Sequence, residues 1–148
     1  MLDVNMYHVV ALAKLYLPQL NDRSQGGFIS VSSITAHCVM PLNTAYCASK
    51  AFCTNFTAGV ALDGLKNVDV LCLQPGATAT NIVPKEKERI KWVGAHPMDV
   101  VNGSLRDLGK VAISYGTFSH EVQGRLIMDW FAYNFPQLWN WSSVMTYS

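Results

Sequence analysis

The sequence predicts an α/β protein in which helices alternate with the strands of a parallel sheet. Two observations carry this prediction: helical and buried-strand patterns alternate over residues 2–73, and the loops between them are short. Half of the 148 residues are hydrophobic and only 14% are charged. This composition suits a single globular domain over residues 1–148 and excludes an intrinsically disordered chain.

The first helix and strand follow from the spacing of apolar side chains. These recur at helical intervals over residues 2–20, with Pro18 in the last turn. The polar stretch 21–27 predicts a loop. Residues 28–32 form a short, mostly apolar run that is typical of a buried strand.

The next two elements repeat this order. Residues 44–65 predict a helix rich in small side chains, which another helix of this chain or of a second copy could approach closely. Residues 69–73 predict a second buried strand, which Pro75 and Gly76 end. Helix, strand, helix and strand joined by short loops indicate parallel strands with crossover helices.

The second half of the chain is less regular. The charged run 85–91 predicts either a solvated face or an anion contact at a lid, and a helix at 98–108 precedes a short strand at 110–115. Six aromatic residues then gather near the end of the chain: Trp130, Phe131, Tyr133, Phe135, Trp139 and Trp141. They cover the core or a neighbouring subunit, line an apolar substrate pocket, or anchor the chain at a membrane surface.

Charge and motif content exclude several classes of protein. Eleven basic and ten acidic residues give a formal charge of +1, which argues against a nucleic-acid-binding face. No apolar run approaches 18 residues and the start of the chain lacks a signal-peptide layout, so we expect an intracellular, cytoplasmic protein. The four cysteines and four histidines lack ligand spacing, which predicts reduced, mostly buried thiols and no metal site.

Residues with useful chemistry follow the carboxyl ends of the predicted strands, where sites in parallel sheets gather. Tyr46 and Lys50 are four residues apart on a helix, so their side chains emerge on one face. An ammonium beside a phenol favours the phenolate, which makes the phenol a usable proton donor and acceptor. Ser33 follows the first strand, where a hydroxyl can bind a carbonyl or alkoxide oxygen. Taken singly, Ser33 could be a turn hydroxyl and Tyr46 a packed aromatic.

Together these motifs resemble the short-chain dehydrogenase/reductase family over about residues 1–110. Four residues match its catalytic set: Asn5, Ser33, Tyr46 and Lys50. The resemblance implies that Tyr46 protonates a carbonyl oxygen or deprotonates an alcohol, while Ser33 holds the substrate oxygen. It also implies that Lys50 assists Tyr46 and binds a nicotinamide ribose, with Asn5 supporting a water relay behind Lys50. Asn5 has a simpler explanation as a helix cap.

The resemblance further implies a nicotinamide cofactor, NAD or NADP. Pro75, Gly76 and Thr80 are similar to the family's Pro-Gly segment, whose threonine meets the nicotinamide, and the glycine permits close approach to a ligand. Tyr46 and Lys50 complete the implied cofactor contacts. The implied fold is a partial Rossmann-type, doubly wound parallel sheet of about three strands with flanking helices. The implied substrate is a small carbonyl or alcohol, with an apolar one favoured by the aromatic tail.

The Gly-rich turn that would bind the cofactor's pyrophosphate has no counterpart here, because Gly26 and Gly27 precede a strand rather than a helix. The strand at 28–32 should therefore lack a neighbour and expose an edge. One hypothesis is the catalytic part of an oxidoreductase whose cofactor half is lost or supplied by another chain, so that this chain alone is inactive. The other is a truncated, inactive relative kept as a structural or interaction subunit.

Both hypotheses predict an assembly. A second copy or a partner chain would cover the open strand edge, and the helices at 2–20 and 44–65 would join copies of the chain. Residues 81–97 correspond to a segment that resembles a substrate loop, and residues 117–148 form an aromatic-rich extension.

Overall fold

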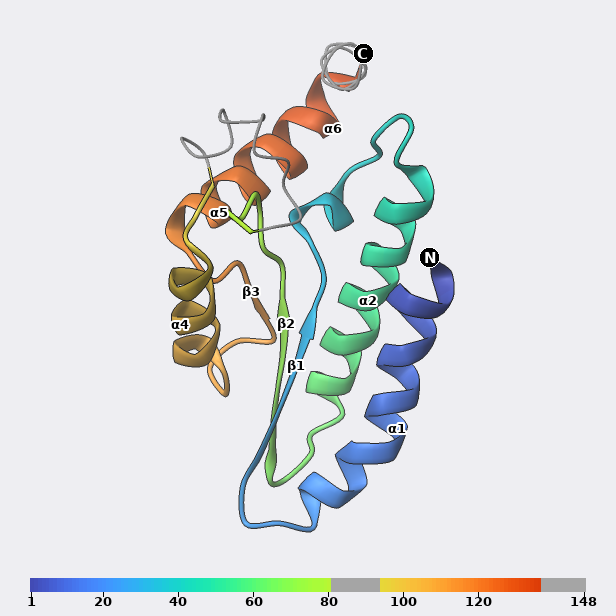
Figure 1. Cartoon of the computed structure of the whole chain (residues 1–148), viewed down its shortest axis with the longest axis vertical. Coiled ribbons are helices and arrows are strands. Elements are labelled where there is room, and N and C mark those ends of the chain that lie inside the picture. Colours follow the sequence, from blue (N-terminus) through green and yellow to red (C-terminus); the bar gives the residue numbers. More distant parts are fainter. Residues whose placement is uncertain (81–93, 137–148) are drawn as a thin grey trace.

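The computed structural model describes residues 1–80 and 94–136 (Figure 1). The charged run 85–91, most of the predicted substrate loop, and the tail residues Trp139 and Trp141 lie outside the described residues. Within these ranges, the predicted α/β class is confirmed.

In the described part of the chain, three parallel strands form a sheet in the order β1-β2-β3. Strand β1 (Gly26–Val31) pairs with β2 (Val68–Leu73) from Gly26 opposite Val68 to Val31 opposite Leu73. Strand β3 (Ile113–Ser114) pairs with the end of β2. Five of the six residues of β2 are buried, as expected for a central strand with both faces covered. In the described chain β1 pairs with β2 alone, so its other edge is open, as predicted.

Helices cover both faces of this sheet. Helix α1 (His8–Asn21) continues from a π-helical turn, η1 (Asp3–Tyr7), and lies beside α2 (Thr44–Leu62) on one face (Figure 1). Helix α4 (Pro97–Asp107) covers the other face. A cluster of apolar side chains from α1 and β2 forms the core on the first face: Ala13, Leu17, Val68 and Val70. Partly buried side chains from the second half of α2 pack against this cluster: Phe56, Val60 and Ala61.

The C-terminal stretch is helical and crosses the carboxyl ends of the strands (Figure 1). It consists of α5 (Phe118–Val122), the π-helix η3 (Gln123–Phe131) and α6 (Ala132–Asn134), which follow one another directly. Several of its large apolar side chains are exposed: Phe118, Val122, Leu126, Trp130, Tyr133 and Phe135. Among the described residues, no helix is both long and apolar enough to span a membrane.

Several predicted element boundaries differ from the observed ones. Gly26 and Gly27 belong to β1 rather than to the preceding loop, because the Gly26 amide donates to the Asn67 carbonyl at 2.7 Å. A Cβ at Gly26 would lie 2.9 Å from the Cβ of Leu20, which explains the glycine there. Helix α2 ends at Leu62, three residues early, and Gly64 follows with a positive φ of 71°. Strand β3 has two residues rather than six, and α4 begins and ends one residue early.

Candidate active site

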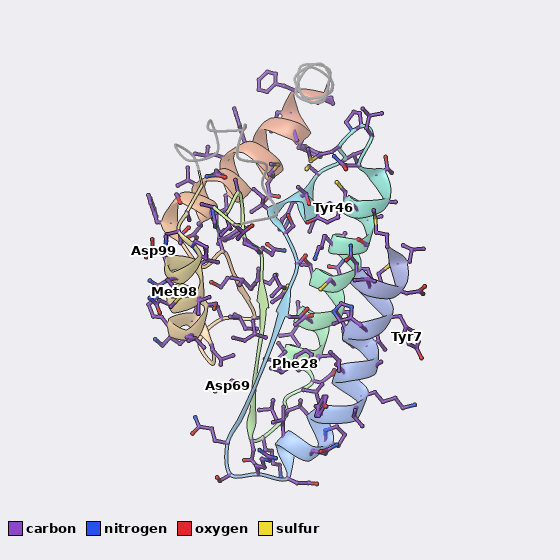
Figure 2. The ribbon with its side chains drawn as sticks, viewed as in Figure 1. Tyr7, Phe28, Tyr46, Asp69, Met98 and Asp99 are labelled. Atoms are coloured by element: carbon purple, nitrogen blue, oxygen red, sulfur yellow. The ribbon has the colours of Figure 1, made fainter. Side chains whose placement is uncertain are left out.

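Tyr46 lies on the first turn of α2, near the carboxyl ends of the strands (Figure 2). Lys50 lies one turn further along the same helix. The Nζ of Lys50 is 5.7 Å from the centroid of the Tyr46 ring, so the predicted shared face is confirmed. Lys50 Nζ also donates to the main-chain carbonyl of Val31 at 3.0 Å. Both side chains are half-buried. The last residue of β1 therefore holds the ammonium beside the phenol.

Asn5 joins the first helix to this pair. Its Nδ2 donates to Ser49 Oγ at 2.9 Å, and Ser49 Oγ in turn donates to the Tyr46 carbonyl at 2.7 Å. Asn5 is thus a link between η1 and α2 rather than a helix cap. Ser49 is fully buried, so this part of the small-residue face of α2 packs within the chain. We refer to Asn5, Tyr46, Ser49 and Lys50 as the Tyr–Lys cluster.

Ser33 follows β1 and caps a one-turn 3-10 helix, η2 (Ile34–His37). Its Oγ accepts hydrogen bonds from the Thr35 amide at 3.2 Å and from Thr35 Oγ1 at 3.0 Å. Ser33 therefore acts as a turn hydroxyl. Because Oγ is the acceptor in both bonds, its own proton is not used in either. This hydroxyl can still donate to an oxygen placed at the strand end.

The Pro75–Gly76 segment lies beside this turn, since the Ile34 amide donates to the Pro75 carbonyl at 3.2 Å. The flank of Gly76 is occupied by protein: a Cβ there would lie 2.7 Å from Cδ2 of His120 and 2.9 Å from Oε1 of Gln123. The glycine predicted to admit a ligand therefore admits a histidine ring on this side.

Thr80 is exposed, and its amide donates to the Thr78 carbonyl at 2.8 Å. Among the described residues no hydrogen bond joins Thr80 to the Tyr–Lys cluster. The structure thus brings together Asn5, Tyr46 and Lys50, and it sets Ser33 beside Pro75.

Three buried or half-buried polar residues near the site were not predicted: His37, Gln74 and His120. Gln74 is fully buried at the end of β2, and its Oε1 lies 2.7 Å from His37 Nε2. His120 is also fully buried, with Nε2 2.9 Å from the Ala77 carbonyl, and no described atom pairs with its Nδ1. Each contact joins residues more than 35 positions apart, so no short motif signals it.

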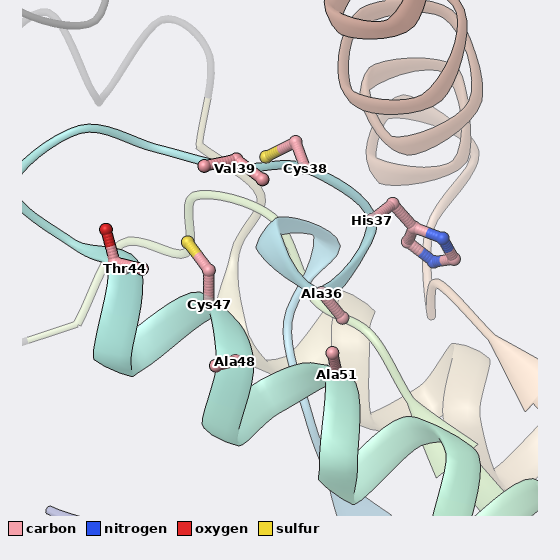
Figure 3. Close-up of a pocket in the computed structure, with 8 residues that line it drawn as sticks. All are labelled: Ala36, His37, Cys38, Val39, Thr44, Cys47, Ala48 and Ala51. Carbon is pink, nitrogen blue, oxygen red and sulfur yellow. The ribbon is translucent and has the colours of Figure 1, made fainter.

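Two hollows lie near the site, one beside His37 and the other beside Lys50. One of about 260 Å³ lies between residues 36–39 and the start of α2, and Figure 3 shows Cys38 and Cys47 among its lining side chains. Burial raises the pKa of the Cys38 thiol to about 12, with Cys47 and Asp129 adding to the rise. The other hollow, of about 400 Å³, runs along the open edge of β1. Asn5, Val31 and Lys50 are among the residues that line it.

Comparison with known families agrees with this geometry. Residues 1–91 match the family model described as short chain dehydrogenase. This protein belongs to the short-chain dehydrogenase family. The match includes Asn5, Ser33, Tyr46, Lys50 and the segment that begins at Pro75.

Individual members of the short-chain dehydrogenase family are similar to this chain over part of their length. The 7beta-hydroxysteroid dehydrogenase of Clostridium sardiniense is 33% identical over 114 residues, which cover 74% of this chain and 44% of that protein. A solved structure of a 7beta-hydroxysteroid dehydrogenase aligns with a TM-score of 0.75 at 25% identity, covering 84% of this chain and 51% of that one.

A 7 alpha-hydroxysteroid dehydrogenase, solved with NADH and 7-oxo glycochenodeoxycholic acid, aligns with a TM-score of 0.60 at 25% identity. That alignment covers 70% of this chain and 45% of the other. This chain spans less than half the length of the curated relatives that it matches.

Proposed function

We propose that this chain carries the catalytic residues of an NAD(P)-dependent oxidoreductase that interconverts a carbonyl and an alcohol. The proximity of Lys50 Nζ to the Tyr46 ring, 5.7 Å from its centroid at the carboxyl end of the sheet, carries this proposal. Ser33 at the end of β1 and Asn5 on η1 complete the proposed catalytic set.

Each residue has a role that its contacts support. The Tyr46 hydroxyl gives its proton to the carbonyl oxygen during reduction and recovers a proton from the alcohol during oxidation. The Lys50 ammonium stabilises the phenolate left on Tyr46. The uncommitted proton of Ser33 donates to the same substrate oxygen. Asn5 holds the turn of α2 that carries the pair, and supports a water relay behind Lys50.

The donor set beside Tyr46 fits the ribose of a nicotinamide cofactor. An ammonium has three N–H donors, and Lys50 gives one of them to Val31, which leaves two for ribose hydroxyls. We propose that Pro75, Gly76 and Thr80 contact the nicotinamide itself. When bound, NAD or NADP would supply or accept the hydride.

We propose a bulky, apolar carbonyl or alcohol of the steroid type as the substrate. The three similar proteins described above are hydroxysteroid dehydrogenases, and one of them was solved with 7-oxo glycochenodeoxycholic acid and NADH. Exposed aromatic side chains near the C-terminal end of the described chain offer apolar surface: Trp130, Tyr133 and Phe135.

The test is turnover of a 7-oxo bile acid with NADH and with NADPH, using the protein purified in its native assembly. Replacing Tyr46 by Phe removes the proton donor and should lower the rate by about 10² to 10⁴. Tyr16→Phe is the matched control, because Tyr16 is an exposed tyrosine of α1 and should leave the rate unchanged. Equal rates for Tyr46→Phe and the parent protein would refute the assignment of Tyr46.

An inactive structural or interaction subunit is the second candidate function. Two observations favour this candidate. The His120 ring lies beside Gly76 and reduces the space for the proposed nicotinamide contact. The outer edge of β1 has no partner strand among the described residues, so a strand of another chain could pair with it. Native mass and identification of tightly bound chains would separate the candidates. A partner chain bound without turnover or dinucleotide binding would support the structural role.

Assembly and location follow from the same surfaces. We propose that a second copy or a partner chain covers the open edge of β1, and that α1 and α2 join copies of the chain.

An intracellular, cytoplasmic location is supported by four free thiols among the described residues. Contact with a membrane surface through the aromatic tail is a further proposal. Equal sedimentation with liposomes, with and without residues 126–148, would refute it.

A further inference from the structure

His120 is a fully buried histidine whose ring lies against the segment that follows β2. Helix α5, which carries it, lies beside this segment (Figure 1), and Thr117 Oγ1 caps the helix by accepting a hydrogen bond from the His120 amide at 3.3 Å. The Nε2 of the ring lies 2.9 Å from the main-chain carbonyl of Ala77. Since a carbonyl oxygen only accepts, Nε2 carries the proton of this hydrogen bond. The ring therefore holds the backbone one residue after Gly76.

The Ala77 carbonyl receives a second hydrogen bond, from the amide of Ala95 at 3.0 Å. The Ala79 amide donates in turn to the Ala95 carbonyl at 3.1 Å, so Thr78 and Ala95 form a short parallel bridge. Thr78 Oγ1 also donates to the Gly76 carbonyl at 3.1 Å. The peptide that joins Ala77 to Thr78 cannot rotate without breaking both bonds to its carbonyl.

This peptide also orients the amide of Thr78. A peptide group is planar and this one is trans, so its N–H points away from its own carbonyl. The Thr78 amide therefore turns away from both Ala95 and His120, and no hydrogen bond joins it to another described residue. Because Thr78 is only half-buried, this donor is available to a ligand at the end of the sheet.

Packing alone does not account for a histidine at position 120. Its Nδ1 is buried and has no hydrogen-bond partner in the described part of the chain. An unpaired buried polar atom costs free energy that an apolar ring would avoid. Cδ2 and Cγ of the ring lie 2.7 Å and 3.2 Å from the place of a Cβ on Gly76, and a phenyl ring would fill the same space. The hydrogen bond to Ala77 is what the histidine adds.

We propose that His120 is a positioning residue for the cofactor, which holds the Ala77–Thr78 peptide so that its N–H faces the nicotinamide group. This inference rests on the proposed function, in which Pro75, Gly76 and Thr80 contact the nicotinamide. His120 acts through the backbone and touches no reacting atom. The ring and the cofactor would lie on opposite sides of this peptide. Rotation of the peptide should weaken cofactor binding and disturb its alignment for hydride transfer.

Dinucleotide titration and steady-state kinetics on the protein in its native assembly test this proposal. His120→Phe keeps an aromatic ring against Gly76 but removes the donor to Ala77. We expect the Kd for NADH or NADPH, followed by nicotinamide fluorescence, to rise about fivefold. The KM for the dinucleotide should rise by a similar factor, while the KM for the carbonyl substrate stays unchanged. A general loss of structure would instead raise both KM values and would overturn the positioning role.

Two further variants make the test specific. His120→Gln places an amide donor within reach of the Ala77 carbonyl and should restore an affinity close to that of the parent protein. Ser119→Ala changes an exposed neighbour on α5 and should leave the affinity unchanged. Equal affinity in His120→Phe and the parent protein would overturn the proposal. A loss in His120→Gln as large as that in His120→Phe would overturn it as well.

NMR on the parent protein covers the case in which His120→Phe does not fold. When the dinucleotide binds, we expect the signals of the Thr78 amide and of the His120 Nε2–H to shift together, because the Ala77–Thr78 peptide joins them. Either signal staying constant while the dinucleotide binds would overturn the positioning role alone. A parent protein that binds neither NADH nor NADPH would refute the proposed function, and the positioning role with it.

Discussion

Two polar groups adjoin each other at the end of the sheet, but the chain holds them in different ways. One is the Tyr–Lys cluster. The other, which we call the polar relay, is a connected set of polar contacts formed by the Lys50 carbonyl, Ser32, Thr54, Gln74, His37 and Asp129. Tyr46, Ser49 and Lys50 lie on consecutive turns of α2, so the helix itself sets most of their geometry. In the relay, α2, η2 and η3 each contribute a member, and Gln74, which directly follows β2, is fully buried. Local backbone positions Tyr46, Ser49 and Lys50, whereas tertiary packing positions Asn5 and the members of the relay.

This difference has an energetic consequence. A half-exposed polar group that loses its partner can bond to water, but a buried one cannot. Loss of the buried Gln74 from the relay should therefore reduce stability, while replacement of the half-exposed Tyr46 or Lys50 should mainly reduce activity. Catalytic side chains at the mouth of a site can be replaced without unfolding the protein. A buried polar network behind the site stabilises the fold only when all its polar groups have partners.

The strongest test of this contrast replaces Gln74 by Leu. Both Thr54 and His37 lose their buried partner, so we expect the free energy of unfolding to fall by about 3 kcal/mol. Asn5→Ala is the counterpart in the Tyr–Lys cluster and should cost about 1 kcal/mol or less, because Asn5 is half-exposed. Urea unfolding of both variants measures the difference. Equal losses would show that burial does not separate the two groups.

The packing of His120 and Gln123 against Gly76 gives a second test, with a smaller expected effect. Gly76→Ala forces a Cβ to within 2.7 Å of the His120 ring and 2.9 Å of Gln123, which should cost about 2 kcal/mol. Gly59→Ala is the matched control, since a Cβ at Gly59 on α2 would meet nothing within 4 Å. That variant should gain about 0.5–1 kcal/mol from helix propensity. Thermal unfolding of the two proteins should shift in opposite directions, and a stable Gly76→Ala protein would mean that His120 moves aside at little cost.

The two groups also differ in how far the sequence predicts them. Periodicity and spacing act over a few residues, so they were sufficient for the alternating helices and strands and for the shared face of Tyr46 and Lys50. They fail where a contact joins distant segments. The start of β1 at Gly26 depends on a hydrogen bond to Asn67, which no local pattern contains.

The same reason hides the buried residues of the site. His37 and Gln74 are 37 positions apart, and His120 meets Ala77 across 43 positions. Gly76 gives another example, because a ring from the C-terminal stretch occupies the space that a Cβ would take there, and no local pattern signals that neighbour. The sequence shows that His37 and His120 are present, but their partners are known only from the fold.

Asp107 belongs to a third polar group, in which all the partners are close to it in the sequence. Its carboxylate accepts hydrogen bonds from Arg106 at 2.8 Å and 3.2 Å and from Ser114 Oγ at 2.6 Å. The bonds from Arg106, and then that from Ser114, lower the pKa of Asp107 below its usual value. Since the folded value is the lower one, the stabilisation is present above the unfolded value of about 3.9 and is lost as pH falls through the folded value.

Replacing Asp107 by Asn should therefore lower the free energy of unfolding at pH 7 by less than about 1 kcal/mol, because its neighbour Arg106 is solvent-exposed. Thermal unfolding at pH 7 and near pH 2 gives the measurement, with Asp99→Asn on the same helix as the control for loss of a carboxylate. The difference between Asp107→Asn and the parent protein should shrink at the lower pH, where both side chains are neutral. A loss as large as that of Gln74→Leu would mean that contacts between chain neighbours stabilise this fold as strongly as contacts between distant elements.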